Sequence, residues 1–164
     1  MATVSWGAPT LQFIPLAAGA EAPSGSWEGV TGFIEIAGDD LLEGSSQLET
    51  SEGDKKTLNN ERGVAVDRKQ MPSAYSFKTS VIKKKGYQSK FASVNGVVAG
   101  DWAMRLIAED PEAVGFTFGK CVISTADGWT ADQGALENLT VDGVEPNGTD
   151  KQICKDYSVQ QSGD

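Results

Sequence analysis

"SAYSFKTSVI", Ser73–Ile82, decides the fold class, because larger and smaller side chains alternate along it. Successive side chains of a β-strand point to opposite faces of the sheet, so a period of two indicates a half-buried strand. One face receives Tyr75, Phe77, Thr79 and Val81, and serine and lysine side chains occupy the other. The pattern predicts a strand with one face on the core.

Similar short apolar runs lie on both sides of this strand, separated by glycine-rich or polar segments. The other segments that we expect to form strands are residues 10–16, 29–38, 63–67, 101–110, 114–125 and 135–144. Within the second of these, Ile34 and Ile36 share one face, opposite Phe33 and Glu35. Residues 17–26, rich in alanine, glycine and serine, predict a flexible loop or arm.

Two of these segments have defined faces. In residues 101–110 a strand would place Arg105 opposite Trp102, Met104 and Leu106, although the spacing of Trp102, Leu106 and Glu109 also fits a short helix. In residues 114–125, alternation predicts one face with Val114, Phe116, Phe118 and Val122 and another with Thr117 and Cys121. A short helix is expected near residues 89–94.

The whole chain therefore predicts one mostly β domain over residues 1–164. Its 19 glycines and the few helical repeats indicate a β-sandwich or barrel of about seven or eight strands with one short helix. A chain of this length buries roughly two thirds of its extended-chain surface, which is enough for a core. A polar C-terminal tail is expected at about residues 145–164.

A long polar segment at residues 38–63 interrupts this pattern. Its central part, "LETSEGDKKTLNNERG" (Leu48–Gly63), has only two leucines and no hydrophobic period of either kind. Structureless loops of this length are uncommon in compact domains unless they carry a function or are disordered. We therefore expect an extended loop between strands, either in contact with other molecules or disordered in a lone monomer.

Charge and hydropathy disfavour several classes of partner. Against 14 basic side chains stand 23 acidic ones, and the net charge of −9 argues against nucleic-acid binding through a basic surface. The chain has no run of about 18 apolar residues, so we expect no membrane insertion. Its first 13 residues lack the basic start and apolar core of a secretory signal.

The sequence offers little for catalysis. It contains no histidine, which removes the commonest general base and the commonest metal ligand. Neighbouring acids occur at Asp39–Asp40 and at Glu109–Asp110 with Glu112, and two carboxylates can suffice for a glycosidase. Acids at strand ends and turns are more simply solvated, so we expect no catalytic residues and no enzyme.

The sequence gives equally little indication of a metal site or a disulfide. Residues 37–44 and 141–150 hold oxygen ligands near glycine, but neither follows the order of a calcium-binding loop, so no metal site is expected. Cys121 and Cys154 lack metal or redox spacing. They form either one disulfide or two free thiols, and a reducing cytoplasm favours the thiols.

The order of these segments resembles a known family. In the second half, the strand pair "WAMRLIA" (Trp102–Ala108) and "VGFTFGKCVIST" (Val114–Thr125) precedes a glycine-rich loop and "GALENLTVDGVEPNG" (Gly134–Gly148). In the first half, a strand, a long loop rich in Glu and Lys, and a returning strand pair occupy residues 33–77. This layout, over most of the chain, resembles bacteriophage tail tube proteins, whose fold is shared by contractile injection and type VI secretion tubes.

The resemblance implies a structural subunit that assembles with itself. Subunits of that family form hexameric rings stacked into the tail's conduit, and each lends strands to a barrel that continues around the ring. The long loop would then make inter-ring or inter-subunit contacts. The residues expected in those contacts are Glu49, Glu52, Asp54, Lys55, Lys56, Glu61 and Arg62.

The resemblance also implies that DNA passes through the tube during genome ejection without specific binding. Carboxylates on the lumen would repel phosphates, and Glu35 and Glu137, which lie mid-strand beside apolar residues, are the candidate lumen-facing acids unless they face outer solvent. Other tail proteins would be partners, and no cofactor is implied. The protein would reside in the virion tail after assembly in the host cytoplasm.

Other readings remain open at this point. The chain could be another virion β protein, such as a tail terminator or capsid decoration protein, or a two-carboxylate hydrolase. It could also be a carbohydrate-binding β-sandwich in which tryptophan stacks on a sugar. For that role Trp102 fits a core position better, whereas Trp129, in a glycine-rich loop, suits either environment.

Overall fold

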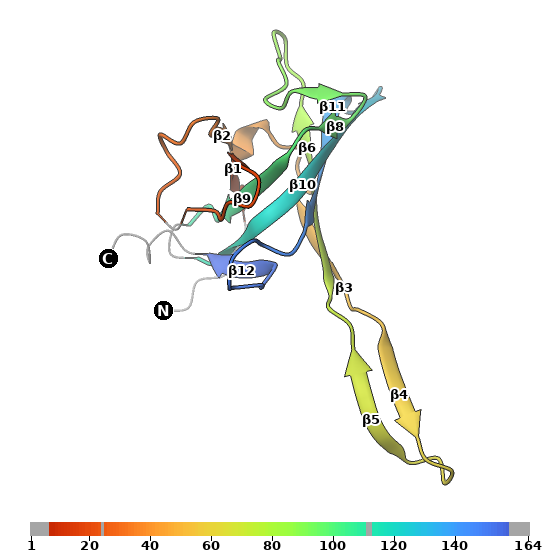
Figure 1. Cartoon of the computed structure of the whole chain (residues 1–164). Helices are drawn as coiled ribbons and strands as arrows, with labels where there is room; N and C mark the ends of the chain where they lie inside the picture. Colours follow the sequence, from red (N-terminus) through yellow and green to blue (C-terminus); the bar gives the residue numbers. More distant parts are fainter. Residues whose placement is uncertain (1–6, 24, 111–112, 158–164) are drawn as a thin grey trace.

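The structure, a computed structural model, describes residues 7–23, 25–110 and 113–157. Within them, an antiparallel sheet of ten strands curls around one core, and a separate two-stranded hairpin projects from it (Figure 1). The predicted mostly β fold is confirmed. The curled sheet is open, because its strand order ends at β2 on one side and β3 on the other.

The described residues form more strands than expected, because several are very short or wholly exposed. The strands are β1 (Thr10–Leu16), β2 (Ile34–Ile36), β3 (Gln47–Ser51), β4 (Lys55–Asn59), β5 (Ala65–Gln70), β6 (Ala74–Ile82), β7 (Ser93–Val94), β8 (Val97–Val98), β9 (Asp101–Ile107), β10 (Gly115–Thr130), β11 (Gly134–Gly143) and β12 (Cys154–Tyr157). Sheet order is β2-β1-β9-β10-β11-β6-β3, with β8 and β12 paired to β10 and β7 to β8. Part of the predicted tail therefore forms β12, and residues 158–164 lie outside the described range.

The core lies inside the curl of the sheet. Its largest fully buried side chains include Phe13 of β1, Phe77 of β6 and Phe118 of β10. The predicted inner face of β6 is confirmed, since Phe77, Thr79 and Val81 are buried and Tyr75 packs against the same cluster. Burying aromatic and aliphatic side chains on one face fixes the register, because a slip of one residue would turn that face to solvent.

The segment at residues 101–110 forms strand β9, so the helical alternative is wrong. Its face assignment is confirmed: Met104 is buried in the main core, with Trp102 and Leu106 packed against that core. Arg105 lies on the opposite face, as predicted, but is buried there.

The face assignment of β10 is wrong beyond Phe118. Pairing with β9 shifts register between Phe118 and Cys121, which marks a β-bulge. An extra residue in one strand reverses the side-chain alternation after it. Cys121 is therefore in the core, while Val122 lies on the outer surface.

The helix expected near residues 89–94 is also wrong, because Ser93–Val94 is strand β7. The helical turn that the described residues do contain is a 3-10 turn at Gly38–Asp40. Phe91 inserts into the core instead, with its ring centroid 5.0 Å from that of Phe13 and 5.5 Å from that of Trp102. An aromatic side chain anchored in this way closes one end of the curled sheet.

The small-residue segment after β1 covers the outer side of the sheet. Trp27 is almost fully buried there, packed with Ile14 of β1 and Ala103 of β9 in a second small cluster. The predicted flexible loop or arm is thus tied to the sheet by one large side chain that follows it in the sequence.

The largest difference from expectation concerns residues 38–63. Apart from the 3-10 turn, this segment forms strands β3 and β4, and β4 pairs with β5 in a hairpin. All residues of β3, β4 and β5 are exposed, so none of these strands has a buried apolar face. Their sequences therefore lack the alternation of apolar and polar side chains from which a strand is predicted.

Candidate functional site

The hairpin β4–β5, which we call the arm (residues 55–70), projects well beyond the sheet that carries it (Figure 1). It joins β3 and β6 through a narrow neck, where the backbone amide of Met71 donates to the carbonyl oxygen of Asp54 at 2.8 Å. At Gly53 an added Cβ would lie 2.1 Å from the carbonyl oxygen of Met71, so only glycine allows the two chains to approach this closely.

The arm exposes apolar side chains as well as charges. Leu58 is 65% exposed, Val64 58% and Val66 59%, and Met71 at the neck is 43% exposed. A two-stranded hairpin without a packed face is at best marginally stable in water. The arm therefore exposes apolar side chains that nothing among the described residues covers.

Charge is divided unevenly between the arm and the rest of the chain. Residues 55–70 carry five basic and two acidic side chains, a net +3. The remainder carries nine basic and 21 acidic side chains, a net −12, which together give the −9 of the whole chain. The arm is thus a basic projection from an acidic body.

All seven residues expected to make contacts lie on the arm or beside it, and all are exposed. Glu49 of β3 pairs with Lys78 at 3.6 Å, and Glu52 in the neck pairs with Lys55 at 3.0 Å. Asp54, Lys55 and Lys56 lie at the base of the hairpin, and Glu61 and Arg62 in the turn at its tip. Exposed ion pairs of this kind contribute little to stability.

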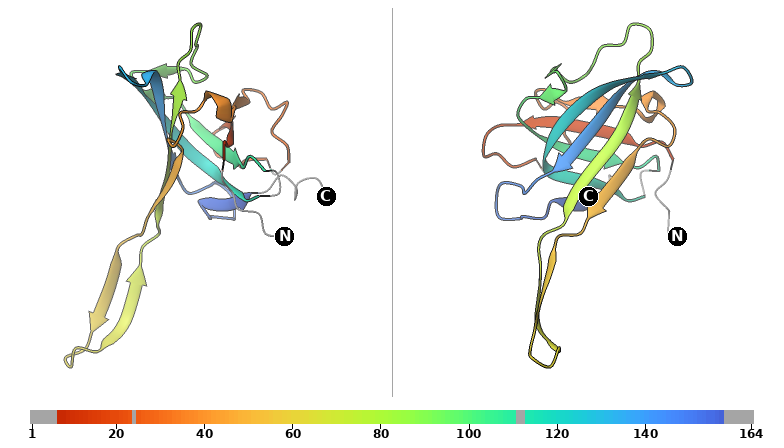
Figure 2. Two further views of the ribbon diagram at one scale, coloured as in Figure 1. Left: turned by 180° about the vertical axis from the view of Figure 1, so that it is seen from behind. Right: turned by 90° about the vertical axis from the view of Figure 1, so that its right-hand side faces the viewer.

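Strands β10, β11, β6 and β3 share an outer face on which no described segment packs (Figure 2, right). Register places mainly small polar side chains on this uncovered face, among them Ser76, Ser80, Ser124, Asn138 and Thr140. Ser80 donates to the side-chain oxygen of Asn138 at 2.6 Å.

The two borders of this uncovered face remain open among the described residues. At one border, β3 is the last strand of the sheet. At the other, β10 pairs with β8 only at Ser124, so its end toward Thr130 has a free edge. Each strand is antiparallel to the next, so β3 and β10 run in opposite directions.

Glu137, one candidate lumen-facing acid, is buried and only 5% exposed. It accepts hydrogen bonds from the hydroxyls of Tyr87 at 3.1 Å and Ser89 at 2.9 Å. Burial of the phenol and the neighbouring Glu137 charge raise the pKa of Tyr87 to about 12. The prediction that Glu137 faces a lumen is therefore corrected. Its carboxylate is buried and links the 83–92 loop to β11 by hydrogen bonds.

Glu35, the other candidate, is exposed on β2 and accepts a hydrogen bond from Gln12 at 3.1 Å. Strand β2 lies at the far end of the sheet order from β3, on the other side of the core from the uncovered face (Figure 2). The acids on the uncovered face are instead Glu49 and Asp142, placed there by register opposite Ser76.

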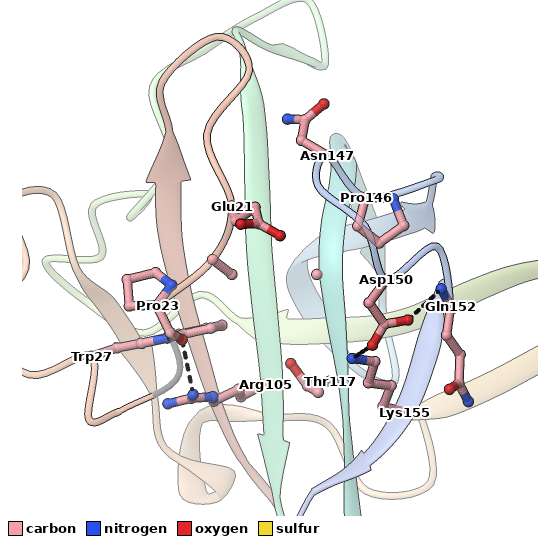
Figure 3. Close-up of a pocket in the computed structure, with 12 residues that line it drawn as sticks. Glu21, Pro23, Trp27, Arg105, Thr117, Pro146, Asn147, Asp150, Gln152 and Lys155 are labelled. Carbon is pink, nitrogen blue, oxygen red and sulfur yellow. Dashed lines mark hydrogen bonds and ion pairs between the residues drawn. The ribbon is translucent and has the colours of Figure 1, made fainter.

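A pocket of about 220 Å³ lies between the 17–33 loop and the chain that leads into β12 (Figure 3). At its floor the guanidinium of Arg105 lies 4.0 Å from the Trp27 ring and 4.6 Å from the Tyr157 ring. It also donates to the carbonyl oxygens of Gly25 at 2.7 Å and Pro23 at 3.3 Å. Burial lowers the pKa of Arg105, but an arginine remains charged at neutral pH.

These contacts give Arg105 a structural role. Its side chain joins three segments that are far apart in sequence: the 17–33 loop, β9 and β12. At the pocket's rim Lys155 pairs with Asp150, which lowers the pKa of that exposed carboxyl. The polar groups at the floor and rim are thus engaged with the protein itself, as Figure 3 shows for Trp27, Arg105 and Lys155.

The remaining chemistry of the described residues is sparse. They contain no group of three or more His, Cys, Asp or Glu side chains arranged to hold a metal ion. Cys121 and Cys154 are free thiols, and burial raises the pKa of both. No described helix is long and apolar enough to cross a membrane.

Two exposed features lie at the end of the sheet opposite the arm, and for one of them, Trp129, the sequence left the environment open. Trp129, near the end of the β10–β11 hairpin, is 73% exposed, and the β7–β8 hairpin carries the exposed Val94 and Val97. The turn of that hairpin, Asn95–Gly96, has positive φ angles of 51° and 86°. An Asn-Gly pair between apolar residues is a sequence signal for such a turn and would have located this hairpin.

No protein-family model matches the chain, and no curated protein matches it.

Proposed function

We propose that this chain is a structural subunit of a viral tail tube. In this proposal, copies form hexameric rings that stack into a conduit for DNA. The observation that supports it most strongly is the uncovered sheet of β10, β11, β6 and β3, with two open borders and an arm that extends beyond it.

The directions of the border strands suit a ring. When copies are related by rotation, β3 of one subunit meets β10 of the next, and because these strands run in opposite directions the new pair is antiparallel. Along the strand direction, the unpaired part of β10 is displaced from β3. Closing a sheet into a barrel requires such a stagger between the two strands that meet. Exposed edges that would otherwise promote aggregation are then paired.

The uncovered face would line the conduit. Its hydroxyl and amide side chains offer no row of cations that would retain phosphates, and Lys78 is paired with Glu49. Repetition of Asp142 around a ring would place negative charge on the lumen, and such charge repels passing DNA. In this arrangement Glu35 faces the outside of the tube.

The arm would contact subunits of the adjacent ring or neighbouring subunits of its own ring. It carries four of the seven residues predicted for such contacts, and it exposes both signs of charge together with apolar side chains. Other tail proteins would meet the tube at its two ends, and the protein would reside in the virion after assembly in the host cytoplasm.

The test is electron microscopy and sedimentation of the purified chain, together with a variant in which residues 55–70 are replaced by Gly-Gly. The two neck strands are hydrogen-bonded at Asp54 and Met71, so a two-residue turn can join them. We expect rings and tubes from the intact chain and a folded variant that forms no long tubes. A chain that stays monomeric at every salt and protein concentration would refute the proposal.

The exposure of Trp129 favours a second candidate, a carbohydrate-binding module. Aromatic side chains on a surface can stack against sugar rings. Fluorescence of Trp129 titrated with a glycan panel separates the two functions: quenching that saturates supports sugar binding, and a flat titration removes it.

A further inference from the structure

An amine, a primary amide and a carboxylate meet beside the β-bulge of β10. The Nζ atom of Lys120, which lies within the bulge, is 3.5 Å from the side-chain oxygen Oδ1 of Asn147. The same Nζ is 3.7 Å from a carboxylate oxygen of Asp101, the first residue of β9. None of the three residues belongs to the arm, and the assembly proposed above uses none of them. Together they have a chemistry of their own, because a lysine amine is a nucleophile and a carboxylate can take its proton.

The amide of Asn147 is held in a fixed orientation. Its Nδ2 donates to the carbonyl oxygen of Ala20 at 3.0 Å, and Oδ1 is directed to the amine. The 144–153 connection, which carries Asn147, is itself fastened to β10, because the backbone amide of Val144 donates to the carbonyl oxygen of Lys120 at 3.0 Å. The amide group is therefore presented to the amine by contacts on both sides.

The amine is restricted by its surroundings as well. The Lys120 side chain is only 22% exposed, although it ends in a charged group. At Gly119 an added Cβ would lie 3.2 Å from Cγ of Pro146, so the connection packs directly against β10 beside the amine. Figure 3 shows Pro146 next to Asn147 on this connection. Groups held together in a productive alignment react as if at very high concentration, about 10⁵ M or more.

We propose that Lys120 and Asn147 form an intramolecular isopeptide bond, with Asp101 as the general base. The Asp101 carboxylate accepts the ammonium proton, and the neutral Nζ attacks Cγ of Asn147. A bond forms between Nζ and Cγ, the bond between Cγ and Nδ2 breaks, and Nδ2 leaves as ammonia, which takes up the proton held by Asp101. Lysine ammonium and primary amide thus become a secondary amide and free ammonium. No electrons are gained or lost, so the step requires no oxidant and no cofactor.

The bond joins β10 to the connection that leads into β12. It closes a loop of residues 120–147 that contains all of β11. A cross-link of this kind stabilises a fold mainly by restricting the unfolded chain. Cys121 and Cys154 are free thiols and supply no such link, and an amide bond, unlike a disulfide, persists in a reducing compartment. Each chain reacts once, so this self-modification goes beyond the tube proposal and does not depend on it.

Mass spectrometry of the denatured full chain tests the bond. We expect an intact mass lower than that of the sequence by about 17 Da, the mass of one ammonia. Cleavage at the acidic residues that lie between the two positions should leave one branched peptide that contains both Lys120 and Asn147. Tandem fragmentation of that peptide locates the bond.

Variants separate the roles of the three residues. Lys120→Arg keeps a cation beside Asp101 but cannot form the bond, so it should have the full mass and unfold at a lower temperature than the intact chain. Asp101→Asn should lower the cross-linked fraction by about tenfold or more, because the base is lost. Lys83 also pairs with a carboxylate, that of Asp127 at 2.7 Å, so Lys83→Arg is the matched control and should keep the mass loss.

Two results would overturn the proposal. The first is a full intact mass after several days at neutral pH, which would leave Lys120 as an ion-pair partner of Asp101 only. The second is a loss of ammonia that persists in Lys120→Arg, because Asn147 precedes Gly148 and can form a succinimide of the same mass without a lysine. Neither result bears on the tube proposal, which is tested by microscopy and sedimentation.

Discussion

The body and the arm use the same antiparallel pairing but are stabilised in different ways. In the body, strands bury one face, and Phe13, Phe77 and Phe118 are at most 1% exposed. In the arm, every residue of β4 and β5 is exposed, and Lys56 stands directly opposite Lys69. Like charges directly opposite one another destabilise a strand pair. The isolated arm is therefore weakly stabilised. Such an arm is expected where contact with another molecule supplies the missing packing.

The largest expected effect lies in the body. Phe118→Ala removes a fully buried ring that contacts Phe116 at a centroid distance of 5.3 Å, and the cavity left behind should cost about 3–5 kcal/mol in the free energy of unfolding. Urea denaturation followed by circular dichroism measures this loss. A change below about 1 kcal/mol, close to the effect of an exposed substitution, would show that the body has no dominant core.

The sequence predicted the body better than the arm for the same physical reason. The alternation in Tyr75, Phe77, Thr79 and Val81 identified β6 and its buried face, because burial selects side chains with a period of two. In β10 the predicted faces are wrong only after Phe118, where the additional residue of a bulge reverses the faces. No hydrophobic pattern marks the position of the bulge in the sequence.

The residues predicted to make contacts were selected by their charge and not by any strand pattern. Lys55, Lys56, Glu61 and Arg62 were assigned to a loop, and they are exposed as expected, but on a hairpin. The prediction for Glu137 is wrong because Glu137 shares its face of β11 with the buried Leu139 and Val141, and Tyr87 and Ser89 cover it from a distant loop. Contacts between segments far apart in sequence leave no local pattern to read.

The next largest effect concerns the cation buried on the outer side of the body. Arg105→Ala removes two aromatic contacts and the hydrogen bonds to Pro23 and Gly25, so we expect a loss of about 2–3 kcal/mol. Limited proteolysis should also cut the 17–33 loop faster. Lys56→Ala on the arm is the control, and it should change the free energy of unfolding by less than about 0.5 kcal/mol. Equal effects of the two variants would contradict the contrast between body and arm.

Alkaline pH should destabilise the body through the ionisation of Tyr87. The pKa of Tyr87 is about 12 in the folded chain against an ordinary 10.0, so between these values the unfolded chain loses the proton first. Stability is therefore fully present below the ordinary pKa and falls as pH rises through the folded value. Glu137→Gln removes one cause of the shift and should lower the pKa of Tyr87.

Ultraviolet absorbance of tyrosinate measures this effect. The chain has three tyrosines, and one of them should titrate late. Tyr87→Phe should abolish the late step, while Leu58→Ser on the arm should leave it in place. A late step that survives in Tyr87→Phe would assign the raised pKa to a different group.

The smallest expected effect on stability falls on the arm. Leu58 and Val66 are 65% and 59% exposed, so Leu58→Ser combined with Val66→Ser should change the free energy of unfolding by no more than about 0.5 kcal/mol. If copies assemble as proposed, the same pair should weaken self-association about tenfold or more, because the apolar area that it removes would be buried between copies. Sedimentation and thermal denaturation of one preparation give both values. Should the double variant unfold several degrees earlier, the arm would be packed within its own chain and the division between a self-sufficient body and a partner-dependent arm would be wrong.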